Sequence, residues 1–257
     1  MPKPRADLAT TFHHNGVAEA YRGRPPYPAE AVELLASLAG GLAGRVLDLG
    51  AGEGAVARPL APLVAHVDAV EAAQAMVDIG QTLPGGDARN LSWHVERAEL
   101  LSPPGPFDLV VAGAAMHWFD LETVCQRLRP ITVDQAPLVL CDRIARHPGL
   151  VDAVDVIRRY SRAPEYDPAY DVADDLDERG LWTRRGVHHT RSVDFRQSPQ
   201  DYLLSLRSTS TLARELMTEP ENAAFDQEIL DLAEPLAEED GLITFSLTST
   251  LVWGSLH

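Results

Sequence analysis

The chain has 257 residues, of which 45% are hydrophobic and 23% are charged, a composition typical of a folded globular protein and not of a disordered one. The formal net charge of -16 repels phosphate backbones and disfavours a nucleic-acid substrate. Because the sequence has no apolar run of membrane-spanning length and no signal peptide, we expect a cytoplasmic protein without a membrane partner.

The first 143 residues alternate between strand-like and helix-like segments. Apolar runs predict strands at 45–50, 66–71, 91–95, 107–113 and 136–142. Apolar residues at helical spacing predict helices at 28–40, 53–66, 73–82 and 121–129. Pro59 and Pro62 should kink or shorten the second of these helices. Strands alternating with helices in this way predict an α/β fold, a Rossmann-like sheet of mainly parallel strands covered on both faces.

The pattern changes after Arg143. Residues 144–185 are expected to be helical and acidic, and the run 165–178 holds seven carboxylates without a basic residue, which is typical of a solvated surface. A strand at 188–195, helices at 198–239 and a last strand at 242–253 then predict an antiparallel edge that closes a sheet of about seven strands. The two cysteines, Cys125 and Cys141, lack CxxC spacing and are expected to be core residues, and no metal-ligand constellation is present.

The sharpest motif is VLDLGAGEG (46–54), in which a buried strand runs into a loop with three glycines. Open α/β sheets bind ligands at the carboxyl ends of their strands, and glycines let the backbone approach the ligand closely. The spacing, with Glu71 about twenty residues on, also fits a nicotinamide dinucleotide. Two carboxylates, Asp48 and Glu53, would repel its pyrophosphate but suit the ammonium and sulfonium of S-adenosylmethionine.

Three motifs in order, VLDLGAGEG, VEAAQAMV and AELL with PFDLVVAGAAMHWFD, resemble those of class I S-adenosylmethionine-dependent methyltransferases. YRGRPPYP (21–28) and HWFD make the chain similar to the small-molecule branch that includes trans-aconitate methyltransferase. The resemblance covers residues 12–143 well and the rest loosely, through STSTLARE (208–215). It implies one methyltransferase domain over 1–257, with an N-terminal lid and first helix (1–44), a cofactor-binding core (45–143), a helical cover and substrate region (144–240) and a last strand (241–257).

The resemblance also implies a set of cofactor residues. Asp48 is expected to hold the methionine ammonium, Glu71 the ribose hydroxyls and Ala72 the adenine, with the adenine also near Ala98. The full set expected to bind the cofactor is Asp48, Gly50, Ala51, Gly52, Glu71, Ala72, Ala98, Glu99, Ala114, Tyr21 and Arg24. Glu96–Arg97 stand where the family often has a Gly-Asp or Gly-Thr pair, which weakens the expected adenine contact of this loop.

His117 is the candidate base, because its ordinary pKa near 6.5 suits proton transfer, with a packing or cofactor-lining role as the alternative. In the resembling family this position commonly shapes the cofactor pocket, while Trp118 packs and Asp120 caps the next helix. Candidate substrate residues are His13, Trp118, Arg143 and Arg207, since an arginine fork suits an anionic acceptor.

Methyl transfer from a sulfonium is an in-line displacement, so the protein mainly positions the reactants. We therefore expect methylation of a small organic molecule, most favourably on oxygen, by a monomer or homodimer. Two alternatives are a cofactor-bound cyclase or binding module that does not methylate, and a nicotinamide-dependent oxidoreductase.

Overall fold

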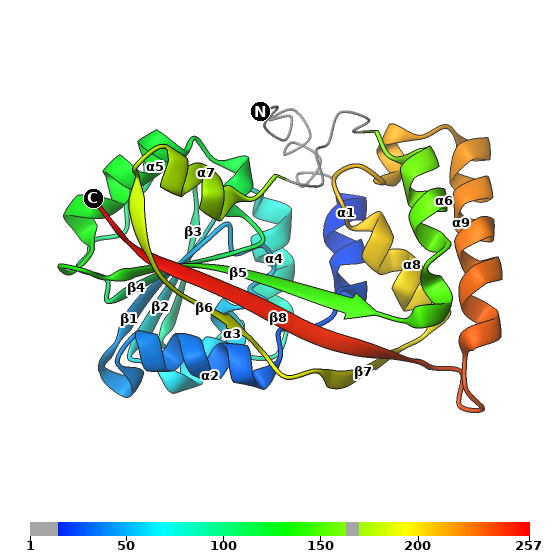
Figure 1. Cartoon of the computed structure of the whole chain (residues 1–257), viewed down its shortest axis with the longest axis horizontal. Coiled ribbons are helices and arrows are strands. Elements are labelled where there is room, and N and C mark those ends of the chain that lie inside the picture. The colour runs from blue at the N-terminus through cyan, green and yellow to red at the C-terminus, as the bar shows by residue number, and fades with distance from the viewer. Residues whose placement is uncertain (1–14, 163–169) are drawn as a thin grey trace. The chain divides into compact units, whose positions relative to one another are not determined.

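Residues 15–162 and 170–257 are described by the structure, a computed structural model (Figure 1). The chain divides into two compact units, and each is assembled from separate stretches of sequence. We call the unit made of 27–143, 169–191 and 249–257 the sheet unit, and the unit made of 1–26, 144–168 and 192–248 the helical unit. The division into lid, core, cover and last strand stays a prediction from the sequence.

The strands belong to one mainly parallel sheet, which confirms the predicted Rossmann-like α/β class. Its strands are β1 (Arg45–Leu49), β2 (His66–Glu71), β3 (Leu91–Val95), β4 (Leu109–Gly113), β5 (Pro137–Arg146), β6 (Trp182–His189), β7 (Val193–Gln197) and β8 (Ile243–Leu256). The order is β3-β2-β1-β4-β5-β8-β6, with β7 paired to β8 off this path. Strands β1 to β5 pair in parallel, whereas β6 and β7 run antiparallel to β8, so the carboxyl ends of β1, β2, β4 and β5 share one edge.

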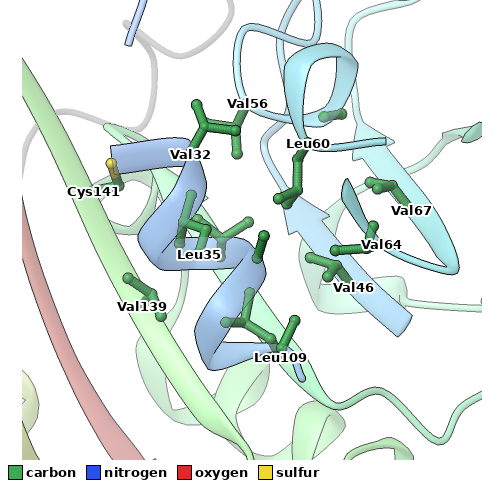
Figure 2. Packing of buried hydrophobic residues seen from close by; sticks show 14 of the residues in the cluster. Val32, Leu35, Val46, Val56, Leu60, Val64, Val67, Leu109, Val139 and Cys141 are labelled. Carbon is green, nitrogen blue, oxygen red and sulfur yellow. The ribbon is translucent and has the colours of Figure 1, made fainter. Parts of the chain in front are cut away.

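Helices cover both faces of the sheet unit. They are α2 (Ala29–Leu38), α3 (Ala57–Leu60), α4 (Gln74–Thr82), α5 (Leu121–Leu128) and α7 (Val172–Glu178). Val32 and Leu35 of α2 and Leu60 of α3 pack on one face against Val46, Val67 and Leu109, as Figure 2 shows. On the other face, α5 and α7 bury apolar side chains against the alternate residues of β1 and β4.

Prolines and glycines set the helix boundaries. Helix α2 follows Pro28 and ends before Gly40, whose φ of +88° is the left-handed conformation that favours glycine. The predicted helix over 53–66 is shortened as expected: α3 has four residues, and a 3-10 turn with Pro62 follows it over Ala61–Leu63.

The helical unit has its own hydrophobic core. It contains α1 (Asn15–Ala20), α6 (Ala153–Tyr160), α8 (Pro199–Arg207) and α9 (Glu219–Ala233). Phe225 and Ile229 of α9 are buried with Leu203 of α8 and Val156 of α6. A capping box of Thr218 and Glu221 starts α9.

Two secondary-structure predictions need correction. The strand predicted at 188–195 is two strands, β6 and β7, because the chain leaves the ladder between them. Strand β6 also begins at Trp182, inside the segment predicted to be helical, because it pairs antiparallel with β8. Part of the acidic run forms α7, and Asp174 and Asp177 pair there with Arg184 of β6.

Both cysteines are buried and free, as expected of core residues. Burial raises the pKa of the Cys125 thiol to about 11 and that of Cys141 to about 12, so both stay protonated and unreactive at neutral pH. None of the helices in the described ranges is long and apolar enough to span a bilayer.

Candidate cofactor and acceptor site

The glycine loop leaves β1 in a conformation that requires glycine. Gly50 has φ +64° and Gly52 has φ +59°. A Cβ added to Gly50 would lie 2.6 Å from the Ala115 Cβ and 3.1 Å from the Phe119 ring. The loop therefore packs directly against the segment that follows β4, and Ala51 between the two glycines is itself buried.

Asp48 is a buried carboxylate, and the described residues provide a hydrogen-bond donor to only one of its two oxygens. Its Oδ2 accepts a hydrogen bond of 3.1 Å from the backbone amide of Ala57, at the start of α3. Its Oδ1 is buried and has no hydrogen-bond partner among the described residues. Burial raises the pKa of Asp48 to about 7, against the lowering effect of the Ala57 amide. A buried acceptor without a donor is costly, so this oxygen suits a cationic ligand group such as an ammonium.

Glu71, at the end of β2, holds the glycine loop in place. Its Oε2 accepts from the Gly52 amide at 2.9 Å, and its Oε1 accepts from the Ala73 amide at 2.8 Å. Each carboxylate oxygen can accept more than one hydrogen bond, so these contacts are compatible with the predicted grip on ribose hydroxyls. Ala72 beside it is exposed.

The second carboxylate of the loop does not act as an isolated charge. Glu53 is buried and forms a salt bridge with Arg58, which also donates to the Glu53 carbonyl. The pair is neutral overall, so the expectation that Glu53 repels a pyrophosphate has to be corrected. The charge argument for a cationic ligand rests on Asp48 alone.

The candidate adenine loop is a 3-10 turn over Ala98–Leu100. Ala98 is buried in the core of the sheet unit. Glu99 Oε1 accepts from the Asp120 amide at 3.1 Å, which joins this turn to the start of α5. The carboxylate of Glu99 therefore has a structural contact that the sequence did not indicate.

The segment after β4 turns sharply along the same edge. Ala114 is exposed with φ +51°, and its amide donates to the Cys141 carbonyl at 2.8 Å. His117 and Trp118 lie in a 3-10 turn with their ring centroids 4.7 Å apart, and both are half-buried. Asp120 accepts from the Thr123 amide at 3.0 Å, which confirms the predicted cap of α5.

Tyr27 and Arg143 complete this edge, and the sequence indicated only Arg143 as a candidate. The buried Tyr27 hydroxyl donates to the Cys141 carbonyl at 3.3 Å, and the Arg143 guanidinium carbon lies 4.4 Å from the Tyr27 ring centroid. The position of Tyr27 at the end of YRGRPPYP, just before α2, was the only signal for it in the sequence.

The sequence did not indicate Trp93, which packs against the glycine loop. Its ring fills the space beside Gly54 of the loop and Gly80 of α4, with 2.7 Å and 2.5 Å to a Cβ added at either position. The alternating pattern of β3 could have indicated that Trp93 faces the core, but its glycine partners are set by tertiary packing.

The remaining predicted residues belong to the helical unit. Arg24 donates to the Ser208 hydroxyl at 2.7 Å and to its carbonyl at 3.1 Å, and its guanidinium lies 4.1 Å over the Tyr21 ring. These contacts join the N-terminal segment to STSTLARE. His13 lies outside the described residues.

Arg207 is 2% exposed, and its donors are used inside the helical unit. Its Nε and Nη2 donate to Asp226 at 2.9 and 2.7 Å, and its other contacts are the Leu212 and Asn222 carbonyls and the Met217 sulfur. This geometry gives Arg207 a structural role in place of the predicted substrate contact.

Comparison with known proteins identifies the core of the sheet unit. Residues 46–133 match the family model described as "Methyltransferase domain". The core of this chain is a class I S-adenosylmethionine-dependent methyltransferase domain. The matched residues include the glycine loop, Glu71, Ala98 and the segment after β4.

Two curated relatives share part of this chain. A malonyl-[acyl-carrier protein] O-methyltransferase of Bacillus cereus is 32% identical over 87 residues, which are 33% of this chain and 32% of the relative. An uncharacterized methyltransferase of Mycobacterium bovis is 32% identical over 134 residues, 51% of this chain and 52% of the relative. The chain therefore spans about a third to about half of the length of these relatives.

Solved structures share the fold over most of this chain, beyond the residues that match the family model. One is a protein of Anaeromyxobacter dehalogenans described as a putative type II methyltransferase. The superposition covers 91% of this chain and 97% of that protein, with a TM-score of 0.63 and 21% sequence identity. Another is the phosphoethanolamine N-methyltransferase 2 of Haemonchus contortus, solved with S-adenosylhomocysteine. The superposition covers 97% of this chain and 59% of that protein, with a TM-score of 0.55 and 12% sequence identity. At these identities the likeness concerns the fold.

The residues present fit the cofactor of this family. The methyltransferase domain uses S-adenosylmethionine. The buried Oδ1 of Asp48, for which residues 15–162 and 170–257 provide no donor, is the acceptor that an ammonium group needs. The loop that follows Asp48 has three glycines at positive φ, Gly50, Gly52 and Gly54, and Glu71 accepts a hydrogen bond from its Gly52 amide, so Asp48 and Glu71 lie at the two ends of this backbone.

Proposed function

We propose that this chain transfers a methyl group from S-adenosylmethionine to an oxygen atom of a small organic acceptor. The observation that carries the proposal is the buried carboxylate of Asp48, one oxygen of which has no partner in the described part of the chain, beside the glycine loop of a methyltransferase domain. The choice of oxygen is supported by one curated relative, which is an O-methyltransferase. The net charge of -16 argues for a small acceptor and against a nucleic acid.

In this proposal the sheet unit holds the cofactor through the residues at its carboxyl edge. Asp48 binds the ammonium, Glu71 the ribose hydroxyls, and Ala72 and Ala98 flank the adenine. S-adenosylmethionine supplies a methyl group that is already activated on a sulfonium. The protein residues therefore need only align the acceptor with that group and exclude water.

The segment Ala114–His117 faces the reacting groups in this proposal. Its backbone is fixed at both ends, by the Ala114 amide on Cys141 and by the Asp120 cap of α5. Methyl transfer from an activated donor depends chiefly on positioning, which a fixed backbone provides, so His117 is assigned a pocket-lining role and Trp118 a packing or acceptor contact. A carboxylate acceptor needs no base, whereas a phenol or amine acceptor does.

The N-terminal segment is proposed to act as a lid through Tyr21 and Arg24. Its support is the pair of hydrogen bonds from Arg24 to Ser208, which gives the segment a defined anchor. Deletion of residues 1–26, which stops short of the buried Tyr27, should weaken the affinity for S-adenosylhomocysteine sharply. Unchanged affinity after this deletion would reject the lid.

Calorimetry tests the proposed function directly. We expect the chain to bind S-adenosylhomocysteine and not NADH, since Asp48 suits an ammonium and disfavours a pyrophosphate. Binding of NADH without binding of S-adenosylhomocysteine would overturn the proposal. Transfer of a labelled methyl group to a member of a panel of small acids, phenols and amines then separates an enzyme from a cofactor-binding protein that does not methylate.

A further inference from the structure

Glu99 connects the candidate adenine loop to the segment that follows β4. It lies in the 3-10 turn Ala98–Leu100, and its Oε1 accepts a hydrogen bond of 3.1 Å from the Asp120 amide, 21 residues along the chain. The Glu99 side chain is 16% exposed, so it is packed among its neighbours although Asp120 itself is exposed. Both residues belong to the sheet unit. Two segments at the carboxyl edge of the sheet are therefore joined by this side chain.

The hydrogen bond from Asp120 to Glu99 contributes to the start of α5. Asp120 is the N-cap of this helix, and its own carboxylate accepts from the Thr123 amide at 3.0 Å. Glu99 thus places a second carboxylate at the positive end of the helix dipole. Arg97 donates to the other oxygen of Glu99 at 3.3 Å, but this exposed pair contributes little. Removal of the Glu99 carboxylate should therefore loosen the chain at Asp120.

Apolar packing supports the same connection. Ala98 of the turn is buried in one hydrophobic cluster with Met116 and Leu121, which precede and follow Asp120 in the sequence. Protein interiors are close-packed, so a displacement of Ala98 changes the contacts of the side chains around it. The turn and the segment after β4 should therefore move together.

The segment 114–120 is also anchored by β5 and by the glycine loop. Its first amide, that of Ala114, donates to the Cys141 carbonyl at 2.8 Å. Ala115 lies so close to Gly50 that a Cβ added to this glycine would be 2.6 Å from the Ala115 Cβ. In the proposed function the glycine loop lies at the methionine end of the cofactor, and neither contact reaches its adenine end. The hydrogen bond to the adenine loop supplies that connection.

We propose that Glu99 is a positioning residue, which couples the adenine end of the cofactor site to the segment that faces the methyl acceptor. The inference rests on the proposed function, because it assumes that adenine binds beside Ala98. An adenine that packs against Ala98 restricts the turn, and the adjacent Glu99 is then held on the Asp120 amide. Coupling between two sites is reciprocal, so an acceptor that orders the segment 114–120 should strengthen binding at the adenine end.

Hydrogen exchange at the Asp120 amide, followed by NMR, measures this coupling. Adenosine is the probe, because it carries the adenine and ribose of the cofactor without the methionine part that the glycine loop would hold. Saturating adenosine should slow exchange of the Asp120 amide in the full chain by roughly two- to ten-fold, the range that corresponds to one hydrogen bond. The Ala114 amide, which donates to Cys141, should exchange at the same rate with and without adenosine.

Three variants separate the coupling from a general effect on folding. Glu99→Gln keeps an acceptor oxygen and should retain the effect of adenosine, whereas in Glu99→Ala the Asp120 amide should exchange equally with and without adenosine. Glu122→Ala is the matched control, because Glu122 is an exposed carboxylate in the first turn of the same helix, 3.7 Å from Arg179, and its loss should change nothing. By reciprocity, the adenosine affinities of all four proteins should agree within about ten-fold.

Three outcomes would overturn the inference. The first is that adenosine leaves exchange at Asp120 unchanged in the unaltered chain, or slows it only together with exchange at Ala114. The second is a slowing that persists in Glu99→Ala. The third is a loss of adenosine affinity beyond about ten-fold in that variant, which would make Glu99 a direct contact of the cofactor. Failure of the unaltered chain to bind either adenosine or S-adenosylhomocysteine is different, because it contradicts the proposed function itself.

Discussion

At the scale of single residues, Asp48 has two roles that a sequence cannot separate. One oxygen accepts from the first residue of α3, as a structural cap does, and the other is buried without a partner among the described residues. The motif VLDLGAGEG predicted a carboxylate at a ligand site, and its position at the end of β1 is as expected. Which oxygen caps α3 and which one stays available to a ligand depends on where α3 begins, and that is set by the tertiary structure.

The raised pKa of Asp48 makes cofactor binding depend on pH. Without ligand, the pKa of about 7 leaves much of Asp48 protonated at neutral pH, and a ligand ammonium favours the carboxylate. Binding should therefore release a proton below pH 7, so the affinity for S-adenosylhomocysteine should rise by about ten-fold in total from pH 6 to pH 8, with most of the rise below pH 7. Calorimetry over this range measures the change.

Asp48→Asn should bind more weakly and lose this pH dependence, because an amide neither titrates nor carries charge. Asp78→Asn is the matched control, since Asp78 is an exposed residue of α4 paired with Gln74. An affinity that does not vary between pH 6 and pH 8 in the unaltered chain would contradict the assignment of Asp48 to the ammonium.

His117→Asn should retain most of the methyl-transfer rate once an acceptor is known. The loss of a general base costs roughly a hundred-fold or more, whereas the loss of a pocket-lining imidazole should cost less than about ten-fold. Initial rates at saturating acceptor and cofactor distinguish these cases. A loss of a hundred-fold, with a shift of the pH–rate profile, would return His117 to the role of base.

At the scale of elements, the strands and helices up to β5 were predictable because each carries its own periodic pattern. Pro59 and Pro62 shortened α3 as expected, and Asp120 caps α5. Strand β6 was not foreseen, because WTRRGVHH has few apolar residues and becomes a strand only through its ladder with β8. In the site, local motifs indicated Asp48, Glu71 and Arg143, but the packing of Arg143 on Tyr27 and the Glu53–Arg58 pair arise from contacts that a motif does not encode.

The glycine loop and the segment after β4 can be tested as a packed pair. Gly50→Ala introduces a Cβ at φ +64° that meets Ala115 at 2.6 Å, and we expect it to lower the free energy of unfolding by about 2–4 kcal/mol. Gly40→Ala has a similar conformation, φ +88°, but no atom within 4 Å, and should cost only about 1–2 kcal/mol.

Chemical denaturation of both variants gives the comparison, and the difference between them isolates the steric contact from the backbone strain. Equal effects would show that the loop can shift away from Ala115 without cost. Affinity for S-adenosylhomocysteine should fall in Gly50→Ala and stay unchanged in Gly40→Ala, because only Gly50 belongs to the ligand edge.

At the scale of the whole molecule, the two units have separate cores and can lose stability separately. In the helical unit the buried Arg207 pairs with the half-buried Asp226, and its guanidinium lies 4.4 Å from the centroid of the buried Phe225 ring. Among the described residues, Arg207→Met leaves Asp226 paired with Arg214 alone. We expect a loss of about 3–5 kcal/mol in the protection of α9 amides against hydrogen exchange, with a smaller change in β4.

Arg196→Gln is the control, because it breaks an exposed ion pair with Glu238 and Asp240 in the same unit. Its cost should be no more than about 1 kcal/mol. Hydrogen exchange followed by mass spectrometry resolves the two units in one experiment. Equal losses of protection in α9 and β4 for Arg207→Met would mean that the units unfold as one.

The place of β8 in the sheet has a consequence for folding during synthesis. This strand follows the other described strands along the sequence, yet it lies between β5 and β6 and also pairs with β7. Until residues 243–256 leave the ribosome, β5 is an open edge and β6 and β7 have no ladder partner. The methyltransferase core is therefore translated early but its sheet is completed late, and a chain stalled after residue 242 should be prone to edge-to-edge aggregation and rely on chaperones.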